Sequence, residues 1–312
     1  MSRNRTLATA TSPEAEASIP RPKPSAMLGL TIHDGDGAEF QEPALKSVRQ
    51  WEDVTGAVCA IGYVGAGAHW IRWPGTATFR IEATGHLHAF PDPRADPARV
   101  RDVCRRLVVP LALQALGYET LHASAVRFPT GLVGICGDRH TGKSTLAYSL
   151  AKRGHQQHAD DMLVLDVCAD EVRAVQLPFD VRLRPEAAVF WGFQPKRSDS
   201  QAVASIDPPH AGADSRVPLA ALFVLRRMER GEPIAERLPA ATAWTALLAN
   251  GYWFESADAE ERGRLVRHYL NIAALIPVYE LRFAPGLDRL DAVLDCIETM
   301  AASAPSAAVC TV

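Results

Sequence analysis

The chain has 312 residues, 47% of them hydrophobic and 22% charged, which suits one large or two smaller globular domains. Its net charge of −3 lacks the basic excess of nucleic-acid-binding domains, and no apolar run reaches the roughly 18 residues that span a bilayer. The six cysteines contain no CxxC pair, so they indicate neither a zinc site nor a disulfide framework. Because the first residues also lack the apolar stretch of a signal peptide, we expect a cytoplasmic protein without a nucleic-acid or membrane partner.

The N-terminal third is predicted to hold a tail followed by a β-rich domain. Residues 1–27 are rich in Ser, Thr, Ala, Pro and charge, with few large apolar groups, and are therefore predicted to be a disordered tail. Residues 28–100 are predicted to form the β-rich domain, since Gly and Pro separate short apolar runs there. Strands are expected at 57–64, 68–73 and 77–83.

A helical pattern opens at Asp96. Apolar side chains recur there at steps of three and four residues, which predicts a helix with Gly117 as its C-terminal cap. The domain boundary is expected near residue 100, and the helix could belong to either side of it. Its repeating apolar positions are Val100, Val103, Leu107, Leu111 and Ala115.

Residues 101–303 alternate between strand and helix patterns, which predicts an α/β core, and residues 304–312 are expected to be a tail. One helix is predicted from Lys143 to Arg153. Ser256 is expected to cap a second helix, and a third should span 287–302. The segment 155–159 is polar for a buried strand. Strands are expected at 121–128, 132–136, 162–167, 219–225 and 278–283.

The loop after the strand at 132–136 carries the sharpest signal. It matches GxxxxGK[ST], the pattern of a phosphate-binding loop, and an amphipathic helix follows it. Glycines let the backbone wrap an anion, while N–H groups and the helix N-terminus point at the phosphates. Lys143 would bridge the β- and γ-phosphates of ATP, and the Ser144 hydroxyl would enter the shell of Mg²⁺. The predicted cofactor-binding set is Gly137, Asp138, Arg139, His140, Thr141, Gly142, Lys143, Ser144 and Thr145.

Two adjacent carboxylates, Asp160 and Asp161, follow between the helix and an apolar strand. They could hold Mg²⁺ or take a proton, and the alternative is that they form a solvated turn or a cap. His122, on the strand before the loop, could be a functional group or a structural hydrogen-bonding residue. Within the loop itself, Arg139 and His140 are expected only to line the site.

The run from Leu121 to Val126, the loop, and the Asp160–Asp161 pair together resemble the HPr kinase/phosphorylase-like kinases. More narrowly, the sequence resembles family members from peptide-tailoring gene clusters, including lasso-peptide kinases that phosphorylate a serine at the C-terminal end of a precursor. The resemblance covers roughly residues 50–300. It implies a P-loop kinase core related to phosphoenolpyruvate carboxykinase, with a smaller β-rich N-terminal domain.

The resemblance also implies roles for individual residues. Asp160 would be the general base, Asp161 would help to hold the metal or the loop, and His122 would interact with the base beside the phosphates. The acidic, glycine-containing signature of true HPr kinases is replaced here by the segment 177–185, which argues against HPr as substrate and against phosphorylase activity. Arg182 and Arg184 of that segment could hold an anion or form an ion pair in the core.

The sequence thus predicts an ATP- and Mg²⁺-dependent kinase that phosphorylates a hydroxyl, with a serine of a peptide or protein as the expected acceptor. Its catalytic residues would be Asp160, Lys143 and His122, with Ser144 and Asp161 at the metal. Two alternatives remain open, namely a nucleotide-binding regulator or scaffold without phosphotransfer, and a kinase of a small hydroxylated metabolite. The sequence also leaves open whether the chain forms a homo-oligomer.

Overall fold

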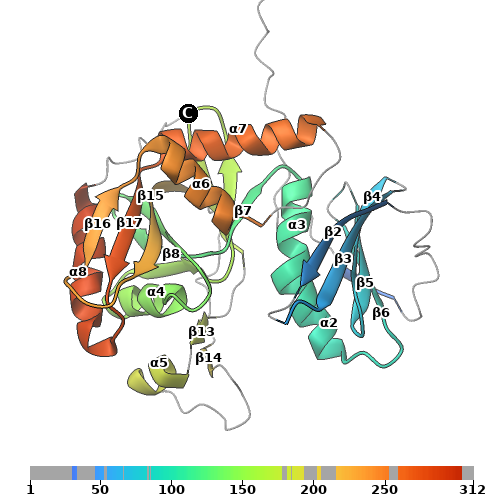
Figure 1. Ribbon diagram of the computed structural model, residues 1–312, viewed down its shortest axis with the longest axis horizontal. Coiled ribbons are helices and arrows are strands. Elements are labelled where there is room, and N and C mark those ends of the chain that lie inside the picture. Colours follow the sequence, from blue (N-terminus) through green and yellow to red (C-terminus); the bar gives the residue numbers. More distant parts are fainter. Residues whose placement is uncertain are drawn as a thin grey trace, which may run out of the picture.

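The computed structural model is a mixed α/β protein with two multi-stranded sheets and helices packed against both (Figure 1). The predicted tails and the predicted cap Ser256 lie outside the described residues, as do Arg184 and the side chain of Arg182. The structure describes residues 30–33, 46–52, 55–65, 67–82, 84, 86–177, 181–183, 185–192, 202–204, 216–252 and 259–303. In these ranges no helix has both the length and the apolar character to cross a bilayer.

The first sheet has six strands, and its strand order is β1-β6-β5-β4-β3-β2. All neighbouring strands are antiparallel except β1 and β6, which are parallel. Phe79, Arg80, Ile81 and Glu82 alternate in direction along β5, so the two apolar side chains lie in the core beneath the sheet. The strands are β1 Leu30–Ile32, β2 Lys46–Glu52, β3 Val58–Gly65, β4 Ala68–Trp73, β5 Ala77–Glu82 and β6 Leu87–Pro91.

The helix after this sheet consists of α2 (Pro97–Val103), the π-helical turn η2 (Cys104–Val108) and α3 (Val109–Ala115). It packs on the first sheet and lies between that sheet and the rest of the molecule (Figure 1). The wider π turn shifts the apolar stripe, so Cys104 and Val108 are buried and the predicted core position Leu107 is only partly buried. The boundary expected near residue 100 falls inside α2, and the domain limits stay a prediction.

The second sheet has a central path of seven strands in the order β10-β8-β9-β15-β12-β11-β7, and β17 and β16 extend from β15. Strand β15 runs parallel to β9 and β17, whereas the other pairs are antiparallel. The strands are β7 Glu119–Leu121, β8 Ala123–Phe128, β9 Gly131–Cys136, β10 Gln156–Ala159, β11 Leu163–Val167, β12 Val172–Val175, β15 Arg216–Arg227, β16 Ile234–Arg237 and β17 Val278–Phe283. A separate pair is formed by β13 Val181–Leu183 and β14 Ala202–Ala204.

The single strand predicted at 121–128 is in fact two strands that separate at His122. Strand β7 pairs with β11 at one end of the strand order, whereas β8 pairs with β9 and β10 at the other. Because one residue joins the two strands, the sheet curls until its ends meet there. The apolar pattern runs through both strands, so the sequence gives no sign of the change in pairing.

The segment 155–159 contains a buried strand, although its polar composition is unusual for one. Strand β10 pairs with β8, and its residues Gln157, His158 and Ala159 are buried. Hydrogen bonding along the sheet edge therefore overrides the polar composition of this segment.

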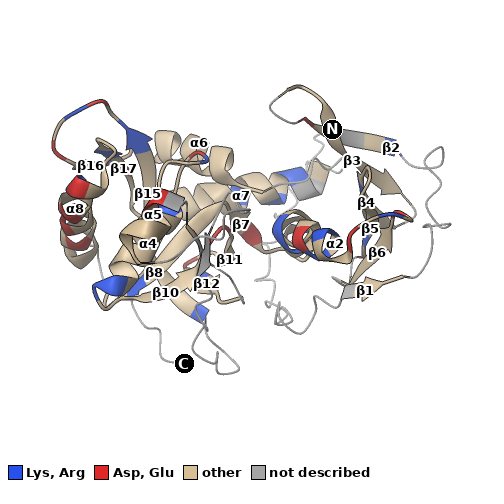
Figure 2. Cartoon of the chain, turned by 90° about the horizontal axis from the view of Figure 1, so that it is seen from below, with Lys and Arg blue, Asp and Glu red and all other residues tan. Residues whose placement is uncertain are grey.

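Helices cover both faces of the second sheet. On one face, α4 (Lys143–Lys152) and α8 (Leu290–Ser303) pack against Val133, Ile135 and Phe223. On the other, α6 (Ala240–Asn250) and α7 (Ala259–Leu275) pack against Leu163 and Leu222. Acidic residues gather on α8 (Figure 2), where Arg153 at the end of α4 contacts Asp291, Asp295 and Glu298.

Candidate functional site

The GxxxxGKST loop joins β9 to α4, as the sequence predicts. Gly137 and Gly142 have φ values of +140° and +117°, and a Cβ on Gly137 would lie 3.0 Å from the Cβ of Leu225. His140 also has a positive φ, of 71°. The loop thus turns tightly enough to deliver the N-terminus of α4, with its unsatisfied N–H groups, to one side of a cavity.

Lys143 is buried beneath the loop, and burial lowers the pKa of its amine. Its Nζ donates to the backbone carbonyl oxygens of Gly137 (2.8 Å) and Asp138 (3.1 Å). The Thr141 hydroxyl donates to the same Asp138 carbonyl at 2.8 Å. These bonds hold the ammonium group against the loop, where it can meet an anion bound by the loop amides.

The end of α6 fastens the beginning of the loop, which the sequence did not predict. The Gly137 N–H donates to Oδ1 of Asn250 at 2.8 Å, and Nδ2 of Asn250 donates to the Ala246 carbonyl at 2.8 Å. The backbone N–H of His122 donates to the Asn250 carbonyl at 2.7 Å. A single turn of chain therefore holds both the loop and the His122 segment in place.

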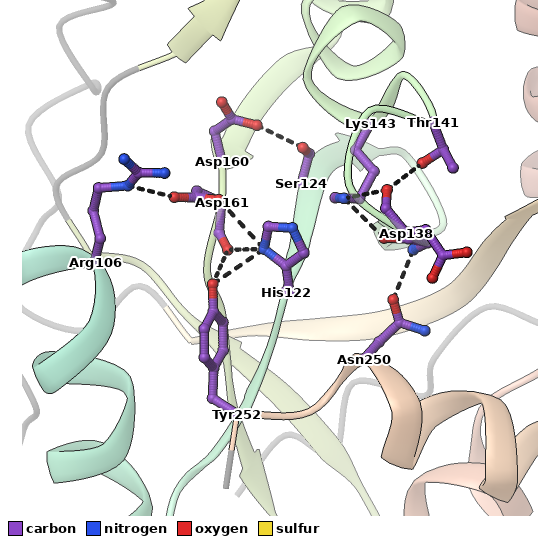
Figure 3. Close-up of polar contacts among 11 residues, drawn as sticks. Arg106, His122, Ser124, Asp138, Thr141, Lys143, Asp160, Asp161, Asn250 and Tyr252 are labelled. Carbon is purple, nitrogen blue, oxygen red and sulfur yellow. Dashed lines mark hydrogen bonds and ion pairs between the residues drawn. The ribbon is translucent and has the colours of Figure 1, made fainter. Parts of the chain in front are cut away.

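Asp160 is buried at the end of β10, and its Oδ1 accepts a hydrogen bond of 2.5 Å from the Ser124 hydroxyl (Figure 3). Ser124 stands on β8, the strand that pairs with β10. The hydrogen bond restricts the rotation of the carboxyl group. Asp160 thus places a carboxyl group of restricted orientation on the wall of the cavity.

Asp161 has a left-handed backbone, with φ of 66°, and its polar atoms contact three side chains (Figure 3). Arg106 Nε lies 3.2 Å from its Oδ2, and His122 Nδ1 lies 3.3 Å from its Oδ1. The Tyr252 hydroxyl donates to its backbone carbonyl at 3.3 Å. A backbone conformation of this kind costs about 1 kcal/mol or more and persists only where its surroundings hold it.

His122 lies at the junction of β7 and β8. Its Nδ1 is 3.1 Å from both the Asp161 carbonyl oxygen and the Tyr252 hydroxyl. Burial, and then the nearby Lys143, lower its pKa, which favours a neutral ring. The left-handed turn at Asp161 lies against the His122 ring, and the expected interaction between His122 and Asp160 stays a prediction.

These groups surround a cavity of about 440 Å³. Its wall includes the loop from Arg139 to Thr145 together with His122, Asp160 and Asp161, so most of the predicted site residues are brought together. The other two act from outside the wall, Gly137 through its bond to Asn250 and Asp138 through its carbonyl. Arg106, Arg227, Glu186 and Tyr252 add polar groups. An apolar rim is formed by Leu107, Leu146, Ala187, Phe283, Pro285, Leu287 and Leu290.

The site suits an anionic ligand that brings its own metal ion. In the described ranges, no three His, Cys, Asp or Glu side chains form a metal-binding group. Mg²⁺ commonly takes only one or two protein oxygens and completes its shell with phosphate and water. The Ser144 hydroxyl and the Asp160–Asp161 carboxylates line the same cavity and fit that role.

Sequence reasoning missed four residues of the site, namely Arg106, Ser124, Asn250 and Tyr252. Ser124 follows His122 by two residues on a strand pattern, so this spacing could have indicated a shared side. The other three come from distant helices and their ends, where nothing in the local sequence connects them to the loop.

The site therefore belongs to a mixed α/β protein whose GxxxxGKST loop opens onto a cavity lined by charged, polar and apolar side chains. No protein-family model and no curated protein matches the sequence. Among solved structures, the chain is similar to the Hpr(Ser) kinase/phosphatase from Coxiella burnetii, with 15% identity and a TM-score of 0.30. The similarity covers 58% of this chain and 95% of that chain. A similarity of this size carries no argument about activity.

Proposed function

We propose that the protein is a Mg-ATP-dependent kinase that transfers the γ-phosphate to a hydroxyl group. The observation that carries this proposal is the placement of the GxxxxGKST loop and the buried Asp160 on the wall of one cavity. A phosphate-binding loop alone would suit any nucleotide-binding protein. A fixed carboxylate beside it adds the proton acceptor that an alcohol needs when it attacks a phosphoryl group.

The residues of this chain divide the work between them. Loop amides and the Lys143 ammonium bind and orient the phosphates, and Ser144 supplies a hydroxyl to the metal. Asp160, held by Ser124, takes the proton from the acceptor hydroxyl. Mg-ATP, when bound, would supply the phosphoryl group, and its Mg²⁺ ion would neutralise part of the phosphate charge. The apolar rim around Phe283 and Leu290 provides a surface against which a nucleobase could pack.

We further propose a serine of a peptide or protein as the acceptor, in line with the resemblance to peptide-tailoring kinases. Strand β2 stands at one end of the described first sheet, so its outer edge could pair with an extended peptide. A precursor peptide with a serine near its C-terminal end is the first substrate to try. The replaced signature at 177–185 argues for transfer in the forward direction only.

The experiment compares wild type with Asp160→Asn, using serine-containing peptides, Mg-ATP and mass spectrometry. Asparagine keeps the shape and the hydrogen bond to Ser124 but is a poor base. We expect kcat to fall by about 10²-fold or more while ATP affinity changes little. Asp170→Asn, which alters an exposed carboxylate, is the matched control. Equal losses in kcat and affinity would assign Asp160 to binding, and ATP binding without any transfer would favour the regulator instead.

A further inference from the structure

Arg106 enters the cavity from a helix that belongs, by packing, to the first sheet. Its neighbours Cys104 and Val108 are buried against that sheet, while Arg106 points the other way and lines the cavity. The π turn is the local cause, because its extra residue changes which side chains face the sheet. The wall of the cavity therefore includes Arg106 and Leu107 of the helix that packs on the first sheet, beside residues of the second sheet and its helices.

The contact that Arg106 makes in the cavity is specific. Its Nε lies 3.2 Å from Oδ2 of Asp161, and its Nη1 lies 3.7 Å from Asp102 on the preceding turn. Burial lowers the pKa of the guanidinium, but the adjacent Asp161 carboxylate reverses this effect and raises it overall. Arg106 is thus a permanent cation facing one member of a carboxylate pair.

Asp161 depends on such contacts. Its left-handed backbone is strained, and Arg106, His122 and Tyr252 hold it from three sides. Among these three partners, Arg106 is the one whose side chain always carries a positive charge. Without that charge, the repulsion of Asp161 by Asp160 and a bound polyphosphate would be offset less fully, by cations such as Lys143.

We propose that Arg106 is a positioning residue that acts through Asp161, which makes the first sheet and its helix a working part of the active site. The inference rests on the proposed kinase function. A guanidinium that contacted substrate phosphate directly would also affect catalysis. The two roles differ in one measurable respect, since a residue that acts through Asp161 loses its effect once Asp161 is altered.

The test is a double-mutant cycle with Arg106→Ala, Asp161→Asn and the double variant. We expect Arg106→Ala to lower kcat by about 10-fold or more in the wild-type background and to change it little beside Asp161→Asn. Arg106→Lys should recover part of the loss, because it keeps the charge without the planar fork. Arg101→Ala removes an exposed cation from the same helix and should leave kcat unchanged. If the loss of kcat in the double variant equals the product of the two single losses, the two residues act independently and the proposal is overturned.

A second readout needs no turnover. The same cycle measured by urea unfolding should show coupling between Arg106 and Asp161, and an absence of coupling would overturn the inference. If wild type phosphorylates substrate but the cycle shows no coupling between Arg106 and Asp161, the inference about Arg106 is wrong and the proposed function stands. If wild type transfers no phosphate, the proposed function is wrong. The catalytic role of Arg106 is then wrong too, even where the unfolding cycle shows coupling.

Discussion

Lys143 is the residue whose loss should matter most for ATP. It is buried, burial lowers the pKa of its amine, and two loop carbonyls accept its hydrogen bonds. We expect Lys143→Met, which keeps the length of the stem, to lower kcat/KM for ATP by at least about 10²-fold, because no other loop side chain places an ammonium at this point. The fold should survive, as judged by an unchanged far-UV circular dichroism spectrum.

The control for this prediction lies on the same helix. Lys152→Met removes an exposed ammonium that lies over the Tyr148 ring at the far end of α4. It should leave the kinetics near those of wild type. Near-normal turnover in Lys143→Met would contradict the assignment of the loop.

His158 should make the protein sensitive to acid. Burial lowers its pKa from 6.5 to about 4. As the pH falls below 6.5, His158 takes up a proton in the unfolded chain but stays neutral in the folded chain until about pH 4. Stability is therefore lost across this window. The full loss corresponds to about 3 kcal/mol.

The variant His158→Leu cannot take up this proton. Between pH 7 and 4.5, its free energy of unfolding should therefore fall by about 2 to 3 kcal/mol less than that of wild type. Urea unfolding at several pH values measures the difference, and the slope with pH is the quantity to compare, since the substitution also changes packing. Equal slopes in the two proteins would show that His158 is not the group that titrates.

The residues of the site differ in how far the sequence reveals them. The loop motif and the Asp160–Asp161 pair are local patterns, and both line the cavity as their chemistry suggests. Asn250 fixes the loop through a hydrogen bond that spans 113 residues of sequence. An asparagine at a helix end is ordinary, so no local signal marks this one as a partner of Gly137.

At the scale of elements, the helices and strands that periodicity predicted lie close to those of the structure, but α6 and several strands, among them β2, β6 and β12, were not predicted. Strand β4 spans 68–73 as expected, and Gly117 and Gly154 both end helices with positive φ. The errors occur where pairing decides the outcome. The split at His122 and the buried strand β10 both depend on which strands become neighbours, and the π turn depends on two surfaces meeting the same helix.

The end of α6 should control how well the loop is formed. Asn250→Ala removes the acceptor for the Gly137 N–H and leaves that group without its side-chain partner. We expect the dissociation constant for ATP to rise by roughly 10-fold, which is the size expected for one lost hydrogen bond of this kind. Thr245→Ala, on an exposed position of the same helix, should change it little. Isothermal titration calorimetry gives both values, and equal affinities would contradict the role of Asn250.

At the scale of the whole molecule, helices join the two sheets. One connection is the hydrogen bond from Arg106 to Asp161. In a second, Arg264 of α7 donates to the Gln114 carbonyl at the end of α3 at 3.0 Å. Composition and periodicity predicted two regions but could not assign the helix at 97–115, because an amphipathic pattern does not say which surface will cover it. Its apolar side faces the first sheet, and its opposite side contributes Arg106 to the cavity, while Leu107 both packs against the first sheet and lines the cavity.

This arrangement predicts that ATP will protect residues on both sides of the cavity from hydrogen exchange. Ligand that binds only the native state suppresses the opening of the elements that line its site, by up to about 2.7 kcal/mol at a hundredfold excess over Kd. We therefore expect Mg-ATP to slow hydrogen exchange at residues 104–108 as well as at residues 139–146. Lys143→Met should abolish both effects together. Slowing confined to residues 119–303 would mean that the first sheet and its helix take no part in nucleotide binding.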